Sequence, residues 1–255
     1  MPTNIFSLQG CRALITGSGR GLGLRMARGL AEAGAEIVIN DVDRELAETS
    51  AKALRSDGHA ARTAIFDVAQ PAEVRDGVHA LEEAVGPVDI LVNNAGIHRY
   101  GALLDLEFSK WKEVLDVNLT GAFLTAQAVG RGMVERQRGK IINVCSLMSE
   151  VGRPTTGSYM AAKGGLKMLT KAMTVEWARH NIQANGIAPG YILSDMTKHL
   201  AAQPEFDAWV KKRTPAARWG TPDDLIGAAV FLASPASNFV NGHILFVDGG
   251  VLASL

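Results

Sequence analysis

The sequence predicts an α/β fold built on a doubly wound parallel sheet of about seven strands, with helices on both faces. The chain has 255 residues, which suits one large domain, and 47% of them are hydrophobic, enough to fill a sizeable core. Short β-branched runs alternate with amphipathic stretches along most of the chain, and short links join them. Because no linker or repeat interrupts this order, we expect a single domain over residues 1–255.

The predicted strands are short, largely apolar runs, as expected for strands that are covered on both faces. "DILVN" and "KIINVC" are examples. The runs cover residues 12–16, 35–40, 62–66, 89–93, 140–145, 182–188 and 243–247.

Helical patterns fill the intervals between these strands. Pro71 and Pro222 stand where the first turn of a helix tolerates proline, each close behind a polar capping candidate. Ligands of such sheets bind outside the carboxyl ends of the strands, and every motif described below follows a strand or lies on the next helix. The helices are expected over residues 21–33, 43–57, 71–85, 109–136, 157–180 and 222–233.

Charge and cysteine content narrow the class of protein. Lys+Arg and Asp+Glu are equal at 26 each, so no net field draws the chain to nucleic acid or to an anionic membrane. No signal peptide or membrane-spanning run is evident, and Cys11 and Cys145 resemble small core residues in a reducing compartment. We expect a soluble, cytoplasmic protein that binds no metal, nucleic acid or membrane.

"LITGSGRGLG", at residues 14–23, follows the first strand and opens the first helix. Its alternating glycines depart from the familiar G-x-G-x-x-G spacing. Glycine is needed where the backbone turns tightly and where a Cβ would collide with a pyrophosphate, and a different register can meet these demands. The loop alone indicates a dinucleotide site, with a flexible connecting turn as the alternative.

The ends of the next strands add polar groups to the same edge of the sheet. Asp41, in "VINDVD", can bind ribose hydroxyls, or it can cap the helix at 43–57. "NNAG" ends the fourth strand, where Asn93 and Asn94 can bridge neighbouring strands and the small residues leave room for a cofactor. From the third and fourth strands we expect cofactor contacts by Asp67, Val68, Asn94, Ala95 and Gly96.

Tyr159 and Lys163 are four residues apart, so on a helix they share one face. An ammonium beside a phenol favours the phenolate and should lower the tyrosine pKa, which suits a general acid–base for a carbonyl/alcohol pair. Ser146 can hydrogen-bond the same substrate oxygen, and the side-chain amide of Asn118 can hold a water that links Lys163 to solvent. Singly, each is equally explained as a chance spacing, a helix cap or a surface residue.

In combination, T-G-x-x-x-G-x-G, the acidic residue after the second strand and N-N-A-G resemble the short-chain dehydrogenase/reductase family. The resemblance explains the glycine spacing as that of a distinct Rossmann branch, and it implies that Asn118, Ser146, Tyr159 and Lys163 are catalytic. It also implies a P-G turn near the nicotinamide, and a homotetramer built on helices 109–136 and 157–180. The implied cofactor contacts are Gly17, Ser18, Arg20, Gly21, Leu22, Gly23, Tyr159, Lys163, Pro189, Gly190, Ile192 and Ser194.

Two residues bear on the choice of cofactor. Asp41 should bind the ribose hydroxyls of NAD and repel the 2′-phosphate of NADP. Arg20 occupies a position that is often basic in members of the family that prefer NADP. Because Asp41 lies at the ribose itself, we expect NAD to be preferred and NADP to be tolerated.

The substrate is expected against Ser146 and Tyr159, walled by a substrate loop at 147–156, by the segment after "NNAG" and by a lid-like region at 193–215. Residues 146–215 are therefore expected to serve the substrate, and the N-terminal half to bind the cofactor. Arginines near a polar mouth suit a carboxylate, and His98, Ser149 and Glu150 can bind sugar hydroxyls, although each is also explained as a solvated loop residue. The candidate substrate residues beside Ser146 and Tyr159 are Arg99, Glu150 and Arg153.

The tail at 212–250 narrows the resemblance to family members that interconvert D-gluconate and 5-keto-D-gluconate, which implies hydride transfer at C5 of a sugar acid. A 3-oxoacyl carrier-protein reductase, or a polyol or 2-deoxy-gluconate dehydrogenase, would share the same motifs. A non-catalytic dinucleotide sensor is a further alternative. The apolar side chains near the C-terminus suit a tetramer contact or the core of the subunit: Phe246, Val247, Val251 and Leu252.

Overall fold

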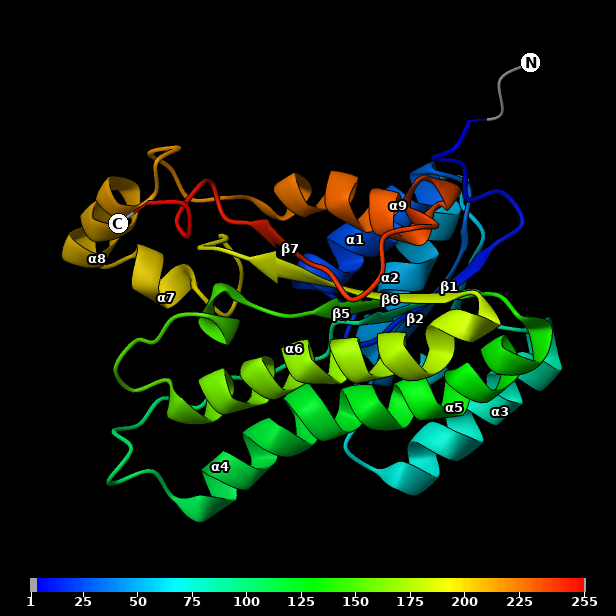
Figure 1. Cartoon of the computed structure of the whole chain (residues 1–255), viewed down its shortest axis with the longest axis horizontal. Helices are drawn as coiled ribbons and strands as arrows, with labels where there is room; N and C mark the ends of the chain where they lie inside the picture. Colours follow the sequence, from blue (N-terminus) through cyan, green and yellow to red (C-terminus); the bar gives the residue numbers. More distant parts are fainter. Residues whose placement is uncertain (1–3, 255) are drawn as a thin grey trace.

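One parallel sheet of seven strands forms the centre of the structure, a computed structural model that describes residues 4–254 (Figure 1). The strand order is β3-β2-β1-β4-β5-β6-β7, as predicted for a doubly wound sheet. The strands are β1 (Arg12–Ile15), β2 (Glu36–Asp41), β3 (Ala61–Ile65), β4 (Ile90–Asn93), β5 (Gly139–Val144), β6 (Ile182–Pro189) and β7 (Ile244–Val247).

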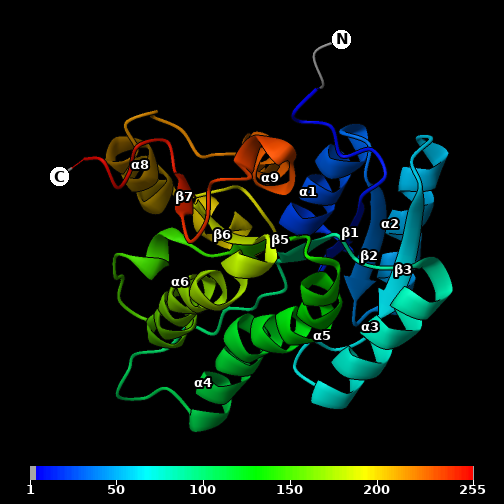
Figure 2. The ribbon, with the colours of Figure 1, turned by 45° about the vertical axis from the view of Figure 1, so that its right-hand side comes forward.

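Helices cover both faces of this sheet, and each layer has its own apolar core (Figure 2). Met26 and Leu30 are among the fully buried side chains of one layer, and Val129 and Met133 among those of the other. The first layer contains α1 (Gly21–Glu32), α2 (Arg44–Ser56) and α9 (Ile226–Ala233); the second contains α3 (Pro71–Val85), α4 (Phe108–Leu115), α5 (Gly121–Arg136) and α6 (Gly157–Trp177).

The predicted helix 109–136 is divided in two. A π-helical turn at Asp116–Thr120 separates α4 from α5, and it holds the buried side chain of Asn118. Such turns interrupt α-helices at functional sites, which agrees with the presence of a poor helix former in the middle of the pattern. The helices predicted over 157–180 and 222–233 are also not α-helical throughout, since Ala178–His180 and Pro222–Leu225 are 3₁₀ turns.

The segment 193–215 carries two short helices that the sequence did not indicate, α7 (Lys198–Ala201) and α8 (Pro204–Arg213). α8 is largely polar and buries only Val210 completely within its length. Its aromatic residues instead pack edge-on against Tyr191, with ring centroids 5.9 Å away for Phe206 and 5.6 Å for Trp209. This lid is therefore held by aromatic contacts next to the carboxyl end of β6.

Three of the four C-terminal apolar residues named above take part in the core of the chain. Val251 is buried, Val247 packs against the core of the first layer, and Phe246 packs against a smaller cluster that includes Ile244. Cys145 is buried and Cys11 half-buried, both as free thiols. Among residues 4–254, no helix combines the length and apolar character that crossing a bilayer requires.

Candidate active site

The glycine loop after β1 packs directly on the N-N-A-G turn after β4. Gly17 has φ +59°, and a Cβ added there would lie 2.8 Å from Cα of Ala95. Asn94 donates from Nδ2 to the carbonyls of Thr16 and Gly17, both at 2.9 Å. The Thr16 hydroxyl accepts the backbone N–H groups of Asn94 and Ala95 at 3.0 Å each, a role for Thr16 that sequence reasoning missed. The two strands at the switch point of the sheet are thus joined into one crevice.

This packing gives a test of the loop. Gly17→Ala should lower the free energy of unfolding by about 2–4 kcal/mol, because the added Cβ must take a left-handed conformation and also displace backbone. Gly58→Ala is the matched control, since Gly58 has φ +87° but nothing within 4 Å of its Cβ position, and it should cost only about 1 kcal/mol. Urea unfolding measures both, and equal losses would show that the contact with Ala95 is unimportant.

The N-terminus of α1 fits a dinucleotide pyrophosphate. The preceding residue, Arg20, makes no side-chain cap, and the first turn contains no acidic residue. Gly21 has φ +61°, and a Cβ there would meet no atom within 4 Å, so its backbone faces open space. Free N–H groups at the start of a helix, beside a glycine that leaves room, form a site for an anion.

Asp41 ends β2 beside this loop and does not cap the following helix. Its Oδ2 accepts the N–H of Gly19 at 3.1 Å, whereas Asp43 caps α2 by accepting the N–H of Leu46 at 3.0 Å. The alternative explanation of Asp41 as a helix cap is therefore wrong. Arg20 is exposed.

The other predicted cofactor contacts lie in the loops after β3 and β6. After β3, Asp67 accepts the N–H of Ala69 at 2.9 Å and Val68 is buried. After β6, Gly190 lies against Asp248, because a Cβ on Gly190 would come within 2.7 Å of Cα of Asp248. Ser194 is positioned by Thr197, whose hydroxyl accepts the N–H of Ser194 at 3.0 Å.

Asn118, Ser146, Tyr159 and Lys163 converge at the carboxyl ends of β4 and β5. Lys163 is buried and donates from Nζ to the carbonyl of Val144 at 2.6 Å, and this Nζ lies 5.6 Å from the ring centroid of Tyr159. Gly96 connects the group to the crevice, since a Cβ there would lie 2.6 Å from Oδ1 of Asn118 and 3.7 Å from Nζ of Lys163. Tyr159 and Lys163, four residues apart in the sequence, are therefore close together in the fold, as predicted.

The expected lowering of the Tyr159 pKa is wrong for the chain itself. Burial raises the pKa of Tyr159 to about 12, and hydrogen bonding from Ser146 opposes the rise without cancelling it. Burial also lowers the pKa of Lys163 to about 8. Desolvation disfavours the charged form of both groups, and the ammonium is directed to the Val144 carbonyl. Together these effects favour a protonated phenol at Tyr159.

The side-chain amide of Asn118 is also not free to hold a water as predicted. Its Nδ2 donates to the carbonyls of Ile97 and Val114 at 2.9 and 2.8 Å, and its Oδ1 accepts the N–H of Ile97 at 3.1 Å. Both amide protons are thereby used. Asn118 instead fastens the π turn to the segment that follows β4.

The three substrate candidates differ in their surroundings. Arg99 forms a two-pronged ion pair with Glu113, at 2.6 and 2.9 Å, and Glu150 pairs with Lys167. Arg153 has no carboxylate partner among the described residues, and its buried Nε lacks any hydrogen-bond acceptor there. Its guanidinium lies 5.7 Å from the ring centroid of Tyr100 and 5.1 Å from that of Phe206. Arg153 and these rings line a cavity of about 600 Å³ under the lid.

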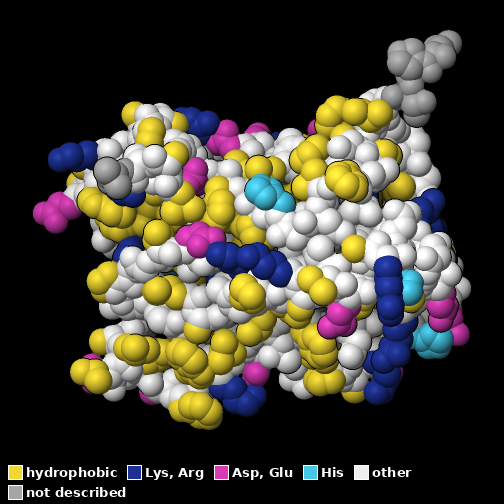
Figure 3. Space-filling view, viewed as in Figure 1, with side chains coloured by type: hydrophobic (Ala, Val, Ile, Leu, Met, Phe, Trp, Pro, Cys, Tyr) yellow, Lys and Arg dark blue, Asp and Glu magenta, His cyan; other side chains and the backbone are white. Residues whose placement is uncertain are grey.

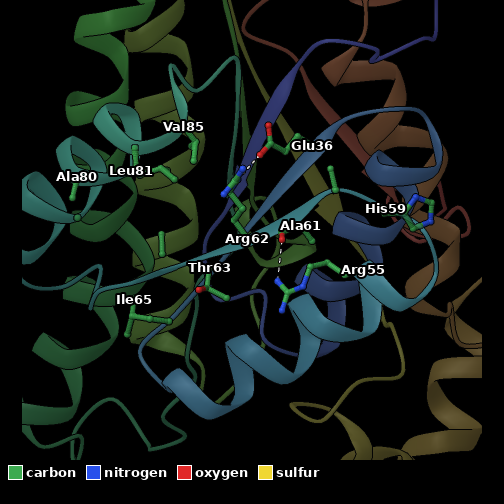
Figure 4. Close-up of a pocket in the computed structure, with 14 residues that line it drawn as sticks. Glu36, Arg55, His59, Ala61, Arg62, Thr63, Ile65, Ala80, Leu81 and Val85 are labelled. Atoms are coloured by element: carbon green, nitrogen blue, oxygen red, sulfur yellow. Dashed lines mark hydrogen bonds and ion pairs between the residues drawn. The ribbon is translucent and has the colours of Figure 1, made fainter.

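A larger hollow, of about 810 Å³, lies along the edge strand β3 (Figure 4). Its charged groups satisfy one another: Arg62 pairs with Glu36 at 2.8 Å, and Arg55 donates to the Ala61 carbonyl at 3.0 Å. None of the four converging residues lines it. Size alone therefore does not mark the functional site of this molecule.

A pyrophosphate-type crevice beside a serine, tyrosine and lysine at the switch point of a doubly wound sheet defines a nicotinamide-dependent oxidoreductase. A family profile described as enoyl-(acyl carrier protein) reductase matches residues 17–252. The chain belongs to the short-chain dehydrogenase/reductase family.

Named relatives are similar over the whole chain. It is 53% identical to the 5-keto-D-gluconate 5-reductase of Escherichia coli (strain K12), over 99% of both chains. It is 49% identical to the gluconate 5-dehydrogenase of Gluconobacter oxydans (strain 621H), over 99% of this chain and 98% of that one. The crystal structure of a gluconate 5-dehydrogenase from Burkholderia cenocepacia J2315 with NADP and tartrate superposes with a TM-score of 0.97, at 55% identity and 98% coverage of both.

Proposed function

We propose that this enzyme interconverts D-gluconate and 5-keto-D-gluconate by transferring a hydride between C5 of the sugar acid and a nicotinamide cofactor. The observation that carries the proposal is Arg153, which lines the cavity under the lid and whose buried Nε has no hydrogen-bond partner among residues 4–254. The stacked rings of Tyr100 and His98 connect this arginine to Tyr159. A guanidinium without a carboxylate partner suits the carboxylate of a sugar acid. The names of the relatives support the same substrate. Relatives named for 2-dehydro-3-deoxy-D-gluconate and galactitol define the alternatives within the family.

The roles of the residues follow from the geometry and the protonation states. The loops after β1 and β4 would hold the nicotinamide cofactor, which would supply the hydride for reduction of the ketone or take it up from the alcohol. In the direction of reduction, the protonated phenol of Tyr159 donates its proton to the developing alkoxide, and Ser146 hydrogen-bonds the same oxygen. Lys163 stabilises the phenolate that remains, and Asn118 holds the segment after β4 in place.

Cofactor contacts are proposed for the loops after β1, β2, β3, β4 and β6. We propose a preference for NAD, because Asp41 lies at the end of β2 beside the glycine loop, where its carboxylate repels a 2′-phosphate. The Burkholderia relative is described with NADP, so we expect NADP to be used as well, at lower efficiency.

The first experiment is a turnover assay with D-gluconate and either NAD or NADP, followed by the absorbance of the reduced nicotinamide. We expect production of 5-keto-D-gluconate, with kcat/KM at least about tenfold higher for NAD, since a buried like-charge contact costs on the order of 1.4 kcal/mol or more. Equal efficiency with both cofactors would contradict the preference. Absence of turnover with gluconate, in both directions, would contradict the substrate.

Arg153→Ala tests the carboxylate contact. The charges of Arg99 and Glu150 are already balanced by Glu113 and Lys167, so we assign the substrate carboxylate to Arg153. We expect KM for gluconate to rise about 10- to 100-fold, as for a lost charge-assisted hydrogen bond. Arg75→Ala, at an exposed arginine on α3 paired with Asp76, is the matched control and should change nothing. An unchanged KM in Arg153→Ala would remove Arg153 from the site.

The assembly and organisation of the chain are part of the proposal. We propose a homotetramer, supported by the exposed apolar side chains of Phe108, Phe123 and Met168 on the layer of α4, α5 and α6, where Figure 3 shows hydrophobic side chains on the surface. We also propose that the N-terminal half binds cofactor while 146–215 provides the substrate loop, catalytic helix and lid. The two free cysteines support a reducing, cytoplasmic location.

A further inference from the structure

The imidazole of His98 lies directly against the proposed acid–base residue. Its ring stacks on that of Tyr159, with centroids 4.8 Å apart and an interplanar angle of 26°. It also stacks on Tyr100, at 3.8 Å and 25°. Tyr100 in turn faces the guanidinium of Arg153, so His98 connects the reacting end of the site with its cationic end.

One nitrogen of this ring is left without a partner. Nδ1 of His98 is buried, and no donor or acceptor within residues 4–254 reaches it. A buried polar atom that is unpaired is costly in a folded protein, and such atoms are normally satisfied by a ligand or by an ordered water. Arg153 has the same property at Nε, at the other end of the stack. Both atoms are therefore positions that a polar group of a bound molecule would satisfy.

The neighbouring polar residues are already engaged. The Ser149 hydroxyl accepts the N–H of Ser146 at 3.2 Å and donates to the carbonyl of Lys163 at 3.0 Å. The Glu150 carboxylate is paired with Lys167. Of the three residues that could bind sugar hydroxyls on the basis of sequence, His98 alone keeps an unsatisfied polar atom among the described residues.

The protonation state of His98 defines what it can bind. Burial, reinforced by the positive charge of Arg153, lowers the pKa of His98 to about 4. At neutral pH the ring is uncharged and offers one hydrogen-bond donor and one acceptor. An alcohol group, which is itself both donor and acceptor, matches this ring, whereas a carboxylate is better matched by Arg153.

We propose that His98 binds a hydroxyl group on the carbon chain between C5 and the carboxylate of the sugar acid, and that it sets a preference for fully hydroxylated acids over deoxy acids. This inference rests on the proposed function and deepens it. His98 is a specificity residue in this scheme, and no proton is transferred through it.

The test compares wild type and His98→Phe on D-gluconate and on the gluconates that lack one hydroxyl at C2, C3 or C4. Phenylalanine keeps a planar ring against Tyr159 and removes both nitrogens. We expect His98→Phe to raise KM for gluconate about 10- to 100-fold while kcat stays within roughly threefold. For one of the monodeoxy acids, wild type should already show the raised KM, and the substitution should not raise it further. An unchanged KM for gluconate in His98→Phe would overturn the assignment, and so would an equal rise in KM for all three deoxy acids when His98 is replaced.

Two further measurements keep the inference testable on its own. His98→Gln restores a donor and an acceptor without the ring, and it should recover part of the lost affinity if hydrogen bonding is the reason. The imidazole ¹⁵N shifts of His98, assigned by their loss in His98→Phe, should move when gluconate is titrated into wild type. This readout needs no turnover: a shift without activity would leave His98 as a binding residue while contradicting the proposed reaction. No shift in an active enzyme would overturn the role of His98 alone.

Discussion

Replacing Tyr159 with phenylalanine should abolish turnover while leaving the fold and cofactor binding intact. The substitution removes only the hydroxyl, and the stacking of the ring on His98 is retained. Because burial raises the pKa of Tyr159 to about 12, the group that is lost is a protonated phenol, the proton donor in reduction of the ketone. General acid–base catalysis contributes about 10²- to 10⁴-fold, so kcat should fall by at least that range.

The experiment pairs two measurements on Tyr159→Phe. Reduction of 5-keto-D-gluconate is followed by loss of the reduced nicotinamide, and cofactor affinity is followed by fluorescence titration. Tyr191→Phe is the matched control, because Tyr191 lies among Phe206, Trp209 and Trp219 in the lid cluster and should keep most of the activity. Loss of cofactor binding together with turnover would indicate a structural defect. Retention of most of the activity would contradict acid–base catalysis by Tyr159, and a protein that binds the cofactor in wild type but never turns over would be a sensor.

The crevice was predictable because parallel strand order brings the carboxyl ends of neighbouring strands together. The motifs after β1 and β4 are more than 70 residues apart in sequence, yet Asn94 hydrogen-bonds Thr16, since β1 and β4 pair in register. Short polar and glycine-rich sequences after apolar runs were sufficient to locate this edge. The seven strands and the principal helices were predicted for the same reason.

Protonation states and side-chain pairing could not be predicted from the sequence. The i, i+4 spacing placed Lys163 near Tyr159 correctly, but the direction of the tyrosine pKa depends on burial, which tertiary packing determines. Likewise, Arg99 and Arg153 looked equivalent, and only the fold shows that Glu113 neutralises one of them. The lid helices were missed because α8 lacks an apolar stripe and is held by aromatic contacts with Tyr191.

Lys163→Met should make the protein inactive and, at neutral pH, more stable. The side chain is buried, and burial lowers the pKa of Lys163 from 10.5 to about 8. A lowering of this size corresponds to a cost of about 3 kcal/mol for keeping the ammonium charged inside the protein, and Lys163→Met removes this cost. The variant also loses the hydrogen bond to the Val144 carbonyl, which offsets about 1 kcal/mol of the gain. We expect a net gain of about 1–2 kcal/mol in the free energy of unfolding at pH 7, with kcat reduced about 100-fold or more.

The stability gained by Lys163→Met depends on pH, because the folded and unfolded chains protonate Lys163 over different ranges. Below pH 8 the lysine is protonated in both the folded and the unfolded chain, so wild type carries the full penalty. Between pH 8 and 10.5 the unfolded chain binds more protons at this residue, so the contribution of Lys163 to stability rises with pH, and above 10.5 the penalty is gone. The advantage of Lys163→Met should therefore be largest at pH 7 and should shrink steadily toward pH 10.

Urea unfolding of wild type and variant at pH 7 and pH 10 measures both effects. Lys171→Met, at an exposed lysine on the same helix, controls for the change of side chain and should show neither. If Lys163→Met were less stable than wild type at pH 7, or gained equally at both pH values, the buried ammonium would not be the source of strain. The expected outcome assigns Lys163 to the site for chemistry at the expense of stability, because the charge that stabilises a phenolate beside the substrate is the same charge that burial disfavours in the resting protein.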